Sequence, residues 1–93
     1  MDEIKRLYAG TVNNTEIELI NLTNGAVLKT ILIGNNTETK QTVTFNIDGT
    51  VFLFDVEAKS TLILDKAIVC NILKATATES LKVHISGIQL GGA

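Results

Sequence analysis

Apolar and polar residues alternate along most of this chain, and short groups of turn-forming residues interrupt the alternation at regular intervals. Alternation places successive side chains on opposite faces of a strand, so one face can be buried while the other meets water. Val43, Phe45 and Ile47 share one face in this way. Many short strands separated by turns are typical of an antiparallel β-sandwich or barrel. The pattern therefore predicts an all-β fold.

The turn signals divide the chain into about eight short strands with little helix. Asp48-Gly49 is the strongest hairpin signal, because both central positions of a type I′ turn need a positive φ angle. Thr23-Asn24-Gly25 predicts a second hairpin. The strands are expected at residues 7–12, 17–22, 26–33, 42–47, 50–54, 60–64, 67–73 and 80–90.

Some segments depart from simple alternation. Residues 67–73 are apolar throughout, which indicates a strand buried on both faces, although periodicity alone also allows a short helix. Gly87 interrupts the last strand and predicts a bulge or a close approach of backbone. Residues 34–41 form the longest polar stretch and predict an exposed loop. Residues 1–6 are expected to form a flexible arm, and residues 91–93 a frayed end.

Length and composition predict one domain, residues 1–93, with a partly covered surface. A chain of this size buries only about 60–65% of its unfolded surface. Charged residues make up 19% of the sequence and hydrophobic residues 45%, with a mean hydropathy of +0.28. Soluble domains average about 25% charged residues. Either much of the chain is core or a partner covers part of its outside, and we expect a homo-oligomer or an assembly component.

Charge and residue usage argue against several classes of partner. The net charge is −2 and the lysines are scattered, so we predict no nucleic-acid binding. No segment approaches the roughly 18–20 apolar residues of a membrane helix, and the charged first residues do not resemble a signal peptide. The single cysteine, Cys70, cannot form an internal disulfide and is expected to be a buried thiol in a protein made in a reducing cytoplasm.

The sequence contains no recognisable catalytic or metal-binding constellation. Nucleophilic catalysis needs a nucleophile, a base and an orienting group, and a zinc site needs several Cys or His ligands. The only histidine, His84, is expected on the outward face of the last strand, beside Lys82 and Ser86. We therefore predict no enzyme, no cofactor and no metal. Four carboxylates at predicted turns or strand ends are expected to be structural: Asp48, Asp55, Glu57 and Asp65.

Threonines occupy the strand faces opposite the large apolar residues. Thr30, Thr42, Thr44 and Thr61 have this placement. Threonine favours strands, and its hydroxyl can pair across strands or with a neighbouring subunit. These faces are either solvated or form a polar surface that docks on a protein lattice, and the sequence leaves both interpretations open.

Four segments follow one another in a characteristic order. Residues 26–35 read Ala-Val-Leu-Lys-Thr-Ile-Leu-Ile-Gly-Asn, residues 43–50 form a hairpin, residues 60–65 end in aliphatic-aliphatic-Asp, and residues 83–88 read Val-His-Ile-Ser-Gly-Ile. This order resembles that of small virion proteins of tailed bacteriophages and prophages, over residues 7–90. The Gly-Asp turn that such chains carry before the last hairpin is replaced here by Asn-Ile-Leu-Lys.

The resemblance implies a single antiparallel, jelly-roll-like β-sandwich that acts as a non-enzymatic structural protein of the virion. The expected role is a capsid decoration or accessory protein that binds and cements the head lattice. The alternative is a tail or fibre component that binds the host cell surface. The implied partners are the phage major capsid protein or other virion proteins, with a homo-oligomer, preferably a trimer, as the free form.

Two segments are candidates for the interface with such a partner, because exposed segments can become ordered on binding. One is the N-terminal arm, and the other is the polar loop. The candidate residues are Asp2, Glu3, Ile4, Lys5, Arg6, Leu7, Asn35, Asn36, Thr37, Glu38, Thr39 and Lys40.

Overall fold

One long strand, β2 (Ile17–Asn35), takes part in both layers of the fold. In the computed structural model, which describes residues 3–91, the first half of β2 pairs with β6 (Ile68–Ala77), and this pairing continues to Leu28 at the start of the second half. Its second half pairs with β7 (Leu81–Gln89) on one side and β5 (Ser60–Leu64) on the other. Gly25 lies between the halves with a φ of 86°, a backbone conformation that glycine adopts without strain. This glycine lies where β2 leaves one layer for the other.

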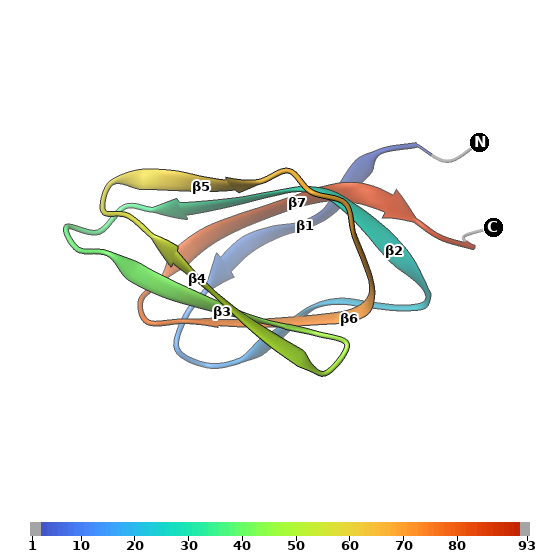
Figure 1. Ribbon diagram of the computed structural model, residues 1–93, viewed down its shortest axis with the longest axis horizontal. Helices are drawn as coiled ribbons and strands as arrows, with labels where there is room; N and C mark the ends of the chain where they lie inside the picture. The colour runs from blue at the N-terminus through green and yellow to red at the C-terminus, as the bar shows by residue number, and fades with distance from the viewer. Residues whose placement is uncertain (1–2, 92–93) are drawn as a thin grey trace.

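The remaining strands complete two layers of four segments each. β1 (Lys5–Val12) pairs with β7, and β3 (Gln41–Ile47) lies between β6 and β4 (Thr50–Val56). Sheet I therefore consists of β1, β7, the second half of β2 and β5. Sheet II consists of the first half of β2, β6, β3 and β4 (Figure 1).

The order of pairing makes this sandwich a jelly roll. When the halves of β2 are counted separately, the seven strands give eight segments. The first segment pairs with the last, the second with the seventh, the third with the sixth and the fourth with the fifth. Nested ribbons that form two four-stranded sheets are the jelly-roll topology. The predicted all-β, jelly-roll-like sandwich is confirmed.

Apolar side chains from alternate positions of both sheets form one core. Val43 and Phe45 are buried and Ile47 is half-buried on the same face, as the alternation predicts. The rings of Phe45 and Phe54 meet edge to face, with centroids 5.8 Å apart. The largest fully buried side chains include Phe45, Leu28, Ile31, Ile33, Leu73, Leu81 and Ile85.

The turn at Asp48-Gly49 is the predicted hairpin. Its φ angles are 51° and 93°, and Ile47 pairs directly with Thr50. The Asp48 carboxylate also accepts hydrogen bonds of 2.9 Å from the backbone N–H groups of Asn71 and Ile72. The turn is thereby attached to β6, and the donors at Ile72 and Asn71 lower the pKa of Asp48.

The second predicted hairpin is wrong. Residues 17–22 and 26–33, expected as two strands, belong to the single strand β2, so residues 3–91 form seven strands and not eight. Asn24 and Gly25 lie where β2 changes sheets, with no reversal of the chain. A turn-forming sequence supplies the local backbone bend in both situations, so local preference cannot separate them.

Two strand boundaries also differ from the expectation. β1 begins at Lys5, so Lys5 and Arg6, expected in a flexible arm, pair with Gly87 and Ser86 of β7. β6 continues to Ala77, and it is not buried on both faces, since Val69 in it is 63% exposed.

Gly87 marks a close approach of two strands, as its position in the sequence predicts. It is buried and pairs with Leu28, next to an irregularity in the register of β2. A Cβ atom built on Gly87 would overlap the carbonyl oxygen of Val27 and lie 3.0 Å from the Leu28 Cα. Only a residue without a side chain fits between these strands.

Candidate functional site

The polar loop between β2 and β3 is held in place by a buried asparagine. Asn35, predicted to be an exposed interface residue, is 2% exposed, so that prediction is wrong. Its Nδ2 donates to the carbonyl oxygens of Val56 and Thr39 at 2.9 and 3.0 Å. Its Oδ1 accepts from the backbone N–H and the hydroxyl of Thr37 at 2.9 and 2.7 Å. The amide thus uses its full bonding capacity inside the protein.

Gln41 extends this network to the start of β3. It is buried, and its Nε2 donates to the hydroxyls of Thr39 and Thr37 at 2.8 and 3.2 Å. The hydroxyl of Thr78 donates to its Oε1. Loop residues 36–40 are therefore held in place by the buried side chains of Asn35 and Gln41. The polar composition of the segment had predicted that both side chains would be exposed.

The exposed members of the loop carry charges that pair with neighbouring segments. Glu38 lies 3.1 Å from Lys59, and Lys40 lies 3.8 Å from Asp55. All four side chains are at least half exposed, so each ion pair adds little to stability. Asn36 is also exposed. The loop is an ordered, polar tip of the sandwich.

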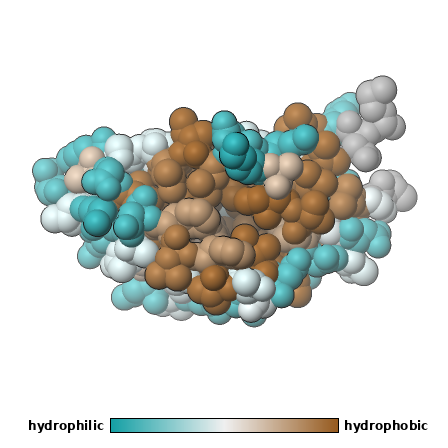
Figure 2. Space-filling view, viewed as in Figure 1, coloured by the Kyte–Doolittle hydropathy of each residue, from teal (hydrophilic) through white to brown (hydrophobic). Residues whose placement is uncertain are grey.

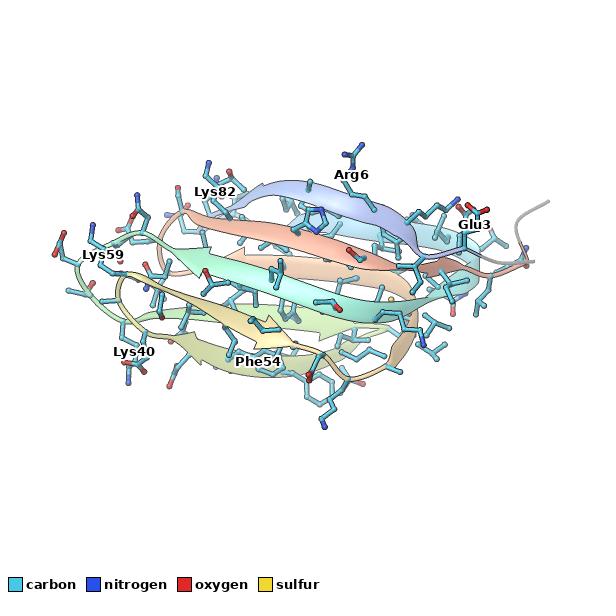
Figure 3. All side chains as sticks on the ribbon, turned by 90° about the horizontal axis from the view of Figure 1, so that it is seen from above. Glu3, Arg6, Lys40, Phe54, Lys59 and Lys82 are labelled. Atoms are coloured by element: carbon cyan, nitrogen blue, oxygen red, sulfur yellow. The ribbon has the colours of Figure 1, made fainter. Side chains whose placement is uncertain are left out.

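The N-terminal candidates lie along the outer edge of sheet I. Glu3, Ile4, Lys5 and Arg6 are exposed, and Leu7 is half-buried against the core. Arg6 projects away from the sheet on β1 (Figure 3).

The structure does not bring the two predicted interface segments together. Glu3 and Lys40 lie toward opposite ends of the molecule, whose longest extent is 43 Å (Figure 3). Asp2 lies outside the described residues. A single compact interface cannot contain both segments, so they are separate candidates.

A shallow hollow crosses the outer face of sheet I beside the loop. Gly34, Thr61 and Lys82 line its centre, and His84 and Leu32 lie further along it. A Cβ atom built on Gly34 would lie 3.8 Å from the Lys82 Cβ, at ordinary contact distance. His84 and Lys82 point outward as predicted, since Leu81, Val83 and Ile85 are buried between them.

The outer face of sheet II carries uncharged polar side chains at its centre. We call it the threonine face and define it as Thr42, Thr44, Asn46 and Thr76, all of which are half-buried. Thr44 pairs with Thr76 on β6 and with Leu53 on β4. The Thr42 hydroxyl donates to Asp55 at 3.0 Å. The threonines predicted to lie opposite the core do so here and, at Thr30 and Thr61, on sheet I.

Strand β4 exposes apolar residues on both of its faces. Val51 is 52% exposed, Phe52 46% and Leu53 67%. The apolar surface in Figure 2 extends over the side of the molecule that carries β4 and β5. The alternating pattern predicts a strand here but no role for it, because nothing in the local sequence shows that the strand lies at an edge.

The chemically reactive groups in the described part of the chain are scattered. Cys70 is buried, and this burial, with a smaller effect of the Asp48 charge, raises the pKa of its thiol to about 11. Among residues 3–91, no group of three or more His, Cys, Asp or Glu side chains is placed to hold a metal ion. No helix in this part of the chain is long and apolar enough to cross a membrane. The candidate sites on the described residues are therefore open surfaces.

Comparison with protein-family models and with the sequences of curated proteins found no match.

Proposed function

We propose that this protein is a non-enzymatic structural protein of a bacteriophage virion that binds an assembled capsid lattice in many copies. In this role it acts by burying surface across lattice subunits, without chemistry. Two observations support the proposal. One is the sequence resemblance to virion proteins, and the other is the jelly-roll fold, an architecture that viral capsid and lectin domains share. Because one fold serves many functions, the fold alone does not carry the proposal.

The observation that carries it is the threonine face. Cores of protein interfaces are depleted in charged residues, because a charge is costly to bury without a partner. The threonine face contains four neighbouring uncharged side chains, and charged groups such as Asp55 and Lys74 lie around it. Half-buried threonines also lose little side-chain freedom on docking. Such a face can be buried against a protein lattice, and because it is polar it also leaves the free protein soluble.

Light scattering coupled to size-exclusion chromatography, with and without heterologously assembled capsid shells of a tailed phage, tests this proposal. We expect the wild-type chain to elute with the shells. Thr44→Arg combined with Thr76→Arg places two cations on the threonine face and is expected to weaken binding at least about tenfold. A folded wild-type protein that ignores every shell would contradict the proposal.

The other outer face provides a matched control. Thr30 and Ser86 are also half-buried and pair across neighbouring strands, but on sheet I. Thr30→Arg combined with Ser86→Arg is expected to leave shell binding unchanged. Equal loss in both double variants would show that the threonine face has no special role.

The hollow on sheet I favours a second candidate function, a tail or fibre component that binds host-surface glycans. Gly34 keeps the hollow open beside Thr61 and Lys82, and the polar loop borders it. Gly34→Val fills this space. Binding to a glycan array by the wild type, and its loss in Gly34→Val, would support this second function; a blank array would exclude it for the glycans tested.

A further inference from the structure

We propose that two copies of this chain pair along their β4 strands, so that sheet II continues across a two-fold axis from one molecule into the next. The inference concerns the free protein and does not depend on a role in a virion. It rests on the contrast between β4 and the other edge strands of the sandwich. It also rests on the complementarity between the β4 strands of two copies.

Strand edges with unpaired N–H and C=O groups attract other strands, and proteins usually protect them with charges, bulges or short length. β1 carries Lys5 and Arg6 and has a register shift just after Arg6. The first half of β2 carries Glu18, followed directly by another register shift. β5 has only five residues. Three edges within residues 3–91 are thus protected.

β4 is less protected, since its one charged residue, Asp55, lies near its end. It spans seven residues and keeps an unbroken register with β3 along its whole length. Residues 50–54 read Thr-Val-Phe-Leu-Phe and contain no charge and no proline. The sheet order within residues 3–91 gives β4 only one strand neighbour, β3. A long, regular and apolar edge of this kind is the type that pairs with another chain.

The hairpin fixes which residues of β4 offer free backbone groups. Ile47 and Thr50 flank the two-residue turn and therefore form a hydrogen-bonded pair, after which bonded and non-bonded pairs alternate. Phe52 and Phe54 consequently bond to β3. Val51, Leu53 and Asp55 direct their N–H and C=O groups away from β3, toward the open edge.

Two antiparallel β4 strands match best when the two-fold axis passes through Phe52. Val51 then lies opposite Leu53 of the second copy, and the two equivalent pairs exchange four backbone hydrogen bonds. Phe52 lies opposite its own copy, and Asp55 lies opposite Gly49, where water can still reach the carboxylate. An axis at Leu53 would instead place Val51 opposite Asp55, an apolar group against a charge. An axis at Phe52 therefore matches Val51, Phe52 and Leu53 with apolar residues and keeps Asp55 away from them.

The expected product is a closed, weak dimer. A two-fold contact uses the same surface on both molecules, so it stops at two copies and does not give the trimer that the sequence resemblance favours. A contact limited to two short strands lies at the small end of interface sizes, below about 1,200 Å² in total, so we expect dissociation in the micromolar range.

Sedimentation velocity over a concentration series tests the dimer. The mass of the wild type is expected to rise from 10.0 kDa to twice that value. Leu53→Lys places a charge on the free edge and is expected to weaken the dimer at least about tenfold. Val69→Lys is the matched control, because Val69 is 63% exposed and Leu53 67%, but Val69 lies on β6. We expect it to dimerise like the wild type.

Oxidative cross-linking tests the register. Opposed residues of a non-hydrogen-bonded pair have Cα atoms about 4.5 Å apart, within disulfide range. Phe52→Cys should therefore form a disulfide-linked dimer, whereas Leu53→Cys, displaced from the axis, should form much less. The natural Cys70 is fully buried, so we expect little cross-linking through its thiol.

A wild type that stays monomeric at high concentration, or forms a trimer, overturns the proposal. So does a Phe52→Cys variant that folds but cross-links no better than Leu53→Cys. A Leu53→Lys monomer that still binds capsid shells would support the dimer and leave the proposed function intact. A dimer that ignores shells would support this inference and count against the proposed function.

Discussion

At the scale of single residues, Asn35 shows how strongly one polar side chain can organise this fold. Its amide connects the end of β2 to the Val56 carbonyl at the end of β4 and to Thr37 and Thr39 in the loop. Each of these groups would otherwise need water, although the site is almost closed to it. The polar tip of the sandwich is therefore built around a buried amide.

Asn35→Ala is expected to lower the free energy of unfolding by about 1–3 kcal/mol, because it leaves buried polar groups without partners. Asn36→Ala is the control, since Asn36 is exposed and should change stability by less than about 0.5 kcal/mol. Urea denaturation of both variants measures the difference. Equal stability of the two variants would show that the Asn35 network contributes little.

Asp48 should make the stability of the protein depend on pH. Its two backbone hydrogen bonds lower its pKa in the folded state below the ordinary value of 3.8. The unfolded state therefore binds the proton more tightly, and the stabilisation is complete above pH 3.8 and is lost as the pH falls through the lower, folded-state pKa. The charged form is the one that the turn favours.

Comparison with Asp48→Asn measures this contribution. At neutral pH the wild type should be more stable than Asp48→Asn in thermal denaturation, and the difference should shrink as the pH falls below 3.8. Asp65→Asn, at an exposed connection, serves as the control for the loss of one charge. A difference that grows toward low pH would contradict this assignment.

At the scale of elements, replacement of a glycine by alanine should have different effects on stability at Gly87 and at Gly34. Gly87→Ala forces a methyl group against the Val27 carbonyl, and we expect a loss of about 1–3 kcal/mol in unfolding free energy. Gly34→Ala meets only ordinary contacts near Lys82 and Thr61, so it should be neutral or slightly stabilising. Thermal denaturation compares them directly, and a harmless Gly87→Ala would contradict the close strand approach.

The sequence predicted those elements in which local pattern and tertiary position agree. The alternation at Val43 and Phe45 and the turn at Asp48-Gly49 follow from local rules, because one face meets the core and the turn must reverse the chain. Gly25 could not be assigned correctly, since a bend within a strand and a reversal between strands require the same local conformation. Only the pairing partners of β2 distinguish them.

The candidate surfaces were harder to predict, because they depend on which strands lie at the edges. Val51 and Leu53 have the apolar character of a buried strand, and their exposure follows from the position of β4 at the end of the sheet order. Asn35 has the character of a loop residue, and its burial follows from the Val56 carbonyl, which is distant in sequence. The threonines were located correctly because alternation alone determines their face.

At the scale of the whole molecule, β2 makes the two sheets depend on each other. Leu28 pairs with Ile68 of β6 and with Gly87 of β7, and its side chain is fully buried. Neither sheet can lose β2 without the other losing a strand as well. We therefore expect unfolding in a single cooperative transition.

Tyr8, the only tyrosine, reports on sheet I through its fluorescence, whereas far-ultraviolet circular dichroism reports on both sheets. The two signals should give coincident transitions in urea. Leu28→Ala should lower the unfolding free energy by about 2–5 kcal/mol and move both signals together, because it removes packing that both sheets share. Ile63→Ala, at a site 59% exposed on β5, should move them little. If the Tyr8 signal changed at lower urea than the dichroism, sheet I would be unfolding alone, and β2 would not couple the layers as its pairing implies.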